Sequence, residues 1–119
     1  KVGLLFIFEE TMKRNAMTID IQFVKMKTSE SMVDYTSKKL QRLAKKYEWV
    51  IRADVFFKQE NDPTEKGQIC EMELSLPGPK IFAASNEKNY EMAVKETISD
   101  LEKQLKKRKA KFTNQNISS

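Results

Sequence analysis

The lysine and arginine side chains of this chain are concentrated in two short segments. Residues 38–46 carry five of them and no acidic residue, and residues 100–111 carry six against two acids. These segments have a combined net charge of +9, whereas the whole chain has +5, so the other residues sum to −4. Closely spaced basic side chains bind phosphate oxygens. We therefore expect both segments to bind a polyanion, with a nucleic acid as the leading candidate.

Both basic segments are predicted to lie on amphipathic helices. In the first, Lys38, Arg42 and Lys45 lie opposite the apolar stripe, and Lys39 and Lys46 flank it. Phosphate contacts of this kind weaken with salt and carry little sequence information. Basic helix faces also occur for solubility alone, but the absence of acids from residues 38–46 favours binding. The predicted phosphate-binding residues are Lys38, Lys39, Arg42, Lys45, Lys46, Lys103, Lys106, Lys107 and Arg108.

The sequence offers few groups for catalysis or metal binding. It contains no histidine and one cysteine, which excludes the commonest general base and the usual zinc sites. Its three glycines are scattered and form no phosphate-binding loop motif. Cys70 is expected on the inward face of a strand, as an inert core thiol rather than a nucleophile. We expect no enzymatic activity, no cofactor, no metal and no small-molecule substrate.

The periodicity of apolar residues places two helices among four strands. Thr28 or Ser29 is expected to cap the first helix, and Ser85 or Asn86 the second. Strands are predicted at residues 18–24, 53–59, 70–76 and 81–84. The apolar stripes are Val33, Thr36, Leu40, Leu43 and Tyr47 on the first helix, and Tyr90, Val94, Ile98, Leu101 and Leu105 on the second.

This order predicts an α+β fold, β-α-β-β-β-α, with a four-stranded mixed sheet. Short turns join the last three strands into an antiparallel meander, and the helical crossover makes the first strand parallel to its neighbour. Each helix has one apolar stripe to bury, and one face of the sheet can cover both. We therefore expect the helices side by side on that face, with their basic surfaces merged into one.

The chain is predicted to form a single domain with short extensions at both ends. Residues 1–16 are expected to lie outside the core, although they could form an extra strand or a membrane-targeting element. The domain is expected to span residues 17–112, and residues 113–119 are predicted to be a disordered tail. No segment has the roughly 18–20 apolar residues that cross a bilayer, and a single cysteine fits a reducing compartment. We expect a cytoplasmic protein without membrane contacts.

Three motifs resemble those of a known family over residues 17–111. The run Lys39-Leu40-Gln41-Arg42-Leu43-Ala44-Lys45 is similar to a K-L-x-x-L-x-K run in its first helix. Leu76-Pro77-Gly78 lies where the family turns between its third and fourth strands, and Leu101-Glu102-Lys103-Gln104-Leu105 is like a segment of its last helix. By these motifs and their order, the chain resembles ribosome hibernation-promoting factors and ribosome-associated inhibitors, once also called sigma-54 modulation proteins.

The resemblance implies a protein that inhibits translation by steric exclusion and catalyses no reaction. Residues 17–112 would then be a ribosome-binding domain that occupies the small-subunit channel where mRNA and tRNAs sit. Lys103 and Lys107 match basic rRNA contacts of the family, and Asp100 stands where a lysine is common and would weaken one contact. The resemblance implies as partners the small ribosomal subunit and the 70S ribosome, a short form that is monomeric off the ribosome, and a role in stress or stationary phase.

Two other functions remain open at this point. The chain could be a general binding module for structured RNA without preference for ribosomes. It could also be a protein–protein regulator that contacts a transcription factor, as the older family name suggests, although the acid-free basic helix argues against this.

Overall fold

The structure is a computed structural model that describes residues 17–118, with the backbone alone over residues 113–118. It has the predicted order β-α-β-β-β-α, so the predicted α+β fold is confirmed. The prediction for residues 1–16 lies outside the described residues. The elements are β1 (Thr18–Phe23), α2 (Glu30–Lys46), β2 (Arg52–Gln59), β3 (Gln68–Ser75), β4 (Ile81–Glu87) and α3 (Tyr90–Ser118).

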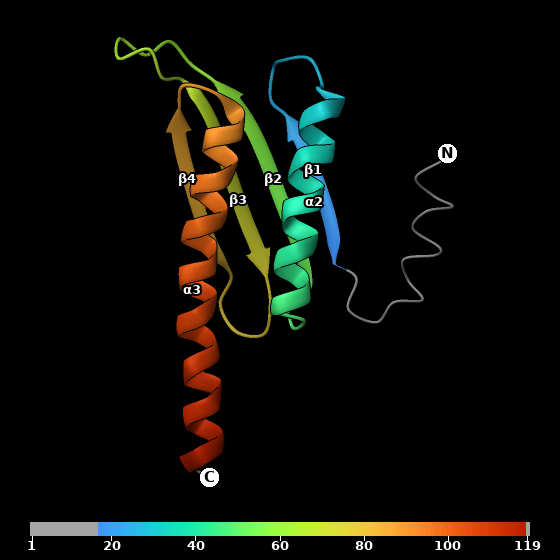
Figure 1. The fold of residues 1–119 in the computed structure, drawn as a ribbon, viewed down its shortest axis with the longest axis vertical. Coiled ribbons are helices and arrows are strands. Elements are labelled where there is room, and N and C mark those ends of the chain that lie inside the picture. Colours follow the sequence, from blue (N-terminus) through green and yellow to red (C-terminus); the bar gives the residue numbers. More distant parts are fainter. Residues whose placement is uncertain (1–16, 119) are drawn as a thin grey trace, which may run out of the picture.

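The four strands form one mixed sheet in the order β1-β2-β3-β4. The β1 strand pairs in parallel with β2, in a register that sets Ile21 opposite Val55. The other two pairings are antiparallel, as the meander requires. Figure 1 shows both helices on the same side of the sheet, α2 near β1 and α3 over β3 and β4. The helices run side by side in the same direction, and their basic segments therefore lie in one layer.

The core lies between the helices and the sheet. On the strands, alternate residues are buried, for example Val55 and Phe57 on β2, because one face of the sheet is covered. Leu40 of α2 and Leu101 of α3 are fully buried in the same core. Burying a leucine contributes about 1.5–3 kcal/mol, so these stripes anchor each helix to the sheet. None of the described helices is long and apolar enough to cross a membrane.

The start of each helix tests the predicted caps. Ser29 caps α2, since its Oγ accepts the backbone N–H of Met32 at 3.3 Å. The predicted caps of α3 are wrong: Ser85 and Asn86 belong to β4, and Asn89 accepts the N–H of Met92 at 2.8 Å instead. The reason lies in Asn86, whose side chain bonds to the β2–β3 loop and so extends β4.

The last helix is longer than the sequence analysis expected. It runs to Ser118, so the structure has helical backbone over 113–118, where a disordered tail was predicted. No proline or glycine interrupts residues 90–119, so nothing in the sequence ends the helix earlier. Its 29 residues span about 44 Å, and Figure 1 shows α3 extending past the end of the sheet.

Three buried polar side chains belong to the core rather than to a reactive site. Burial raises the pKa of the Cys70 thiol to about 12, which supports an inert thiol. The Thr97 hydroxyl lies 2.7 Å from the carbonyl oxygen of Ala93 and 3.3 Å from that of Cys70. The Thr36 hydroxyl is equally buried but has no hydrogen-bond partner within residues 17–118.

Because the Thr97 hydroxyl is hydrogen-bonded and the Thr36 hydroxyl is not, we expect a change from threonine to valine to have opposite effects on stability at the two positions. Thr36→Val replaces an unsatisfied buried hydroxyl by a methyl group, so it should raise the free energy of unfolding by about 1 kcal/mol. Thr97→Val removes a hydroxyl that is hydrogen-bonded, so it should lower that free energy by about 1 kcal/mol. Urea unfolding of both variants measures the change. A loss of stability in Thr36→Val as large as that in Thr97→Val would contradict the assignment.

Candidate nucleic-acid interface

The exposed side of α2 carries the first group of predicted basic residues. Lys38, Arg42 and Lys45 are all exposed, because the opposite side of the helix packs on the sheet through Thr36, Leu40 and Leu43. The three side chains are three or four residues apart and so share one helix face. This face is positively charged along about two turns.

The flank of α2 that faces α3 holds the second group. Lys46 Nζ lies 3.0 Å from Glu102 Oε2 on α3, which joins the two helices. The hydrogen bond to Glu102 raises the pKa of Lys46. Lys39 Nζ lies over the Tyr35 ring, 5.1 Å from its centre. Both cations therefore border the line where the helices meet.

The basic residues of α3 divide between its outer side and the same interhelical line. Lys106 lies one turn beyond Glu102 and so on the flank toward α2. Lys103 and Lys107 are exposed and lie one turn apart on another side of the helix. The helices α2 and α3 lie side by side on one face of the sheet, so these cations belong to neighbouring helices of one layer. We use "basic surface" for Lys38, Lys39, Arg42, Lys45, Lys46, Lys103, Lys106 and Lys107.

The predicted residue Arg108 differs from the rest of the set. Its guanidinium donates hydrogen bonds to the carbonyl oxygens of Pro77 and Pro79, both at 2.9 Å. These carbonyls belong to the turn between β3 and β4, so Arg108 is held against the fold rather than extended into solvent.

Two lysines of the basic surface form ion pairs at the protein surface: Lys38 pairs with Asp34, and Lys46 pairs with Glu102. Ion pairs at the surface contribute about 0–1 kcal/mol to the stability of a protein.

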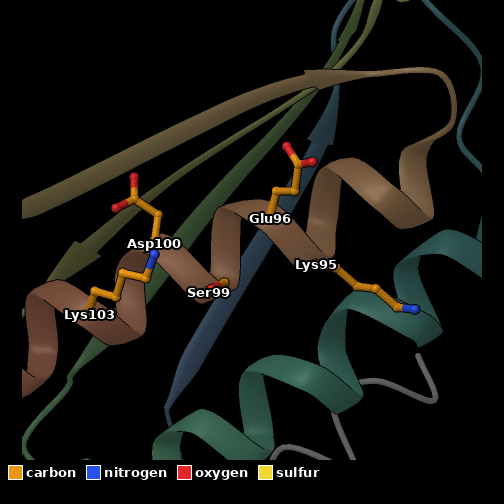
Figure 2. A pocket seen from close by; sticks show the side chains of 5 residues that line it. All are labelled: Lys95, Glu96, Ser99, Asp100 and Lys103. Atoms are coloured by element: carbon orange, nitrogen blue, oxygen red, sulfur yellow. The ribbon is translucent and has the colours of Figure 1, made fainter.

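Two further lysines lie on the interhelical flank of α3, outside the predicted set. Figure 2 shows the Lys95 side chain pointing toward α2. Lys109 Nζ lies 5.9 Å from the centre of the Tyr47 ring at the end of α2. Their spacing from Glu102, seven residues before and seven after, is two helical turns and would have revealed them. Once Glu102 is known to face α2, both belong to the same line of charge.

Two of the four acids of α3 lie on its other flank. Glu96 and Asp100 point toward the β4 side and away from α2 (Figure 2). They line a shallow depression together with Lys95, Ser99 and Lys103, all from α3 itself. A shared hydrogen bond with Glu87, at the end of β4, raises the pKa of Glu96. Asp100, which departs from the family pattern, therefore lies on the same flank of α3 as Lys103 and not between the helices.

The outer face of the sheet also carries acids. Asp20 and Asp54 lie opposite each other on β1 and β2 and share Arg52, at 3.1 Å and 3.0 Å. Glu73 lies opposite Asp54 on the next strand. Positive charge is therefore concentrated on the helices, and the sheet face does not extend it. Within residues 17–112 there is no group of His, Cys, Asp and Glu side chains suited to a metal ion.

The comparisons with known proteins agree with this architecture. The pattern of the family described as "Sigma 54 modulation protein / S30EA ribosomal protein" matches residues 19–113. No curated protein sequence matches the chain.

Solved structures share the fold over most of the chain. A ribosomal subunit interface protein from Coxiella burnetii is 25% identical with a TM-score of 0.66, over 79% of this chain and 99% of that one. The crystal structure of the Thermus thermophilus Protein Y N-terminal domain is 24% identical with a TM-score of 0.66, over 76% of this chain and 98% of that one, and shows the fold alone. Because the family pattern covers most of the chain and confirms the resemblance in the sequence, the protein belongs to the sigma 54 modulation protein / S30EA ribosomal protein family.

Proposed function

We propose that this protein binds the ribosome through the basic surface and inhibits translation by occupying the mRNA and tRNA channel of the small subunit. The observation that carries the proposal is the placement of both basic helices on one side of the sheet, while Asp20, Asp54 and Glu73 lie on its outer face. Membership of the family and the likeness to a protein named for the ribosomal subunit interface give the proposal its partner.

The proposed inhibition requires that the protein binds rRNA and fills the channel, and it requires no chemical reaction. Lysine and arginine side chains replace counterions along the rRNA backbone, which gives affinity without reading bases. A folded domain seated in the channel then excludes mRNA and tRNA sterically. Cys70, the only cysteine, is buried and protonated at neutral pH, so it supplies no nucleophile. We propose that the domain acts in the cytoplasm of stressed or stationary cells, as a monomer when off the ribosome.

The second candidate is a general module for structured RNA. The predominance of lysines favours it, because a lysine ammonium is a point charge that recognises phosphate wherever it lies. The two functions differ in what competes with binding, since only a fit to the channel depends on the shape of the subunit. The third candidate, a protein–protein regulator, is suggested by the older family name, and no contact within the described residues favours it specifically.

A charge-reversal variant tests the role of the basic surface. Lys39→Glu, Arg42→Glu, Lys103→Glu and Lys107→Glu together should weaken co-sedimentation with small ribosomal subunits on the order of a hundredfold or more, because four phosphate contacts become repulsive. The matched control reverses four exposed lysines outside both helices, Lys25, Lys27, Lys80 and Lys88, with the same change in net charge. Circular dichroism checks that both variants fold. Equal losses in the two variants would show that net charge, not this surface, governs binding.

A competition experiment separates the channel from RNA in general. Small subunits preloaded with mRNA and tRNA should fail to bind the protein, because the channel is already filled. An excess of double-stranded RNA of mixed sequence should displace little of the protein from empty subunits. Ready displacement by the duplex, with preloaded subunits still binding, would favour the general RNA-binding module.

A further inference from the structure

The part of α3 beyond the sheet is held on two sides. Up to Phe112, where the described side chains of α3 end, Leu105 is the last fully buried residue, so none of residues 106–112 is fully buried. On one side Arg108 bonds to the β3–β4 turn. On the other, the Phe112 ring packs edge-on against Trp49, with 5.2 Å between ring centres. A helix end with so few buried contacts would otherwise fray.

The β3–β4 turn is shaped to receive the guanidinium of Arg108. Gly78 has a φ of +92°, a conformation that residues with a side chain rarely adopt. A Cβ atom there would lie 3.0 Å from Arg108 Nη1, so the arginine occupies the space that the glycine leaves. The Pro77 and Pro79 carbonyls accept one hydrogen bond each from the two terminal nitrogens. A planar guanidinium can span two carbonyls in this way, whereas a lysine ammonium is a single point.

We propose that Arg108 is a positioning residue that clamps the projecting part of α3 to the β3–β4 turn and thereby holds Lys106 and Lys107 in place for phosphate. This inference rests on the proposed function and changes the role that the sequence analysis gave to Arg108. Because the clamp orders this part of the helix during folding, the helix loses no further conformational entropy when the protein binds RNA. The clamp thus raises affinity without touching RNA.

The salt dependence of binding to purified small ribosomal subunits separates a clamp from a phosphate contact. Arg108→Lys keeps the charge but cannot span both carbonyls. It should bind severalfold more weakly than the wild type, with the same slope of log affinity against log salt. Lys107→Ala is the matched control and should reduce the magnitude of that slope by about 0.7–0.9. If Arg108→Lys binds as the wild type does and Arg108→Ala reduces the slope as Lys107→Ala does, Arg108 contacts phosphate and the proposal is overturned.

Hydrogen exchange of the full chain without ribosomes tests the clamp by itself. In both Arg108→Lys and Arg108→Ala, the backbone amides of residues 106–112 should exchange on the order of tenfold faster, since two hydrogen bonds from a charged donor are lost or weakened. Amides of residues 93–101 should keep their wild-type rates. Unchanged exchange at residues 106–112 would overturn the clamp. The two proposals can fail separately. If exchange is faster in the variants but the wild-type protein does not bind small subunits, the clamp is supported and the proposed function is refuted.

Discussion

The arrangement depends on burial of two apolar helix stripes against a single face of one sheet. Leu40 on α2 and Leu101 on α3 are fully buried in the same core as Val55 and Phe57 of β2. Each helix has one apolar side, so once that side is fixed the opposite side must face solvent. Because the β-α-β crossover and the β-β-α end return both helices to the same face, the two basic helices lie in one layer on that side of the sheet (Figure 1). The electrostatics of the surface thus follow from packing.

A surface built from like charges has to be held together against its own repulsion. The Lys46–Glu102 pair places one acid at the line between the helices, where it attracts a cation of α2 to α3. Two of the other acids of α3, Glu96 and Asp100, point the other way (Figure 2). Exposed pairs of this kind contribute little to stability, so the apolar contacts supply most of the free energy and the acids mainly shape the field. Such a field can attract a polyanion from one direction and disfavour the opposite approach.

Patterns within a few residues allowed the fold to be predicted, and contacts far apart in sequence limited the prediction. The alternation in β2 and β3 and the Ser29 cap are local, and both were predicted. The start of α3 was missed because Asn86, a plausible cap, bonds to Gly67 and Asp62, 19 and 24 residues away. The contacts of Arg108 could not be predicted, because its carbonyl partners Pro77 and Pro79 lie 31 and 29 residues earlier, where no periodicity points to them. Lys95 could be assigned to the flank facing α2 only once the position of Glu102 relative to α2 was known, and the folded structure supplies that position.

The most direct measurement of the central claim is lysine modification at limiting reagent, read by mass spectrometry with and without small ribosomal subunits. If the basic surface faces the rRNA, modification of Lys38, Lys45, Lys103 and Lys106 falls severalfold in the complex. Lys58, on the outer face of the sheet, and Lys80, outside both helices, then keep the rates they have in the free protein. Protection of Lys58 with undiminished modification of the helix lysines would show that the sheet meets the ribosome and would contradict the account.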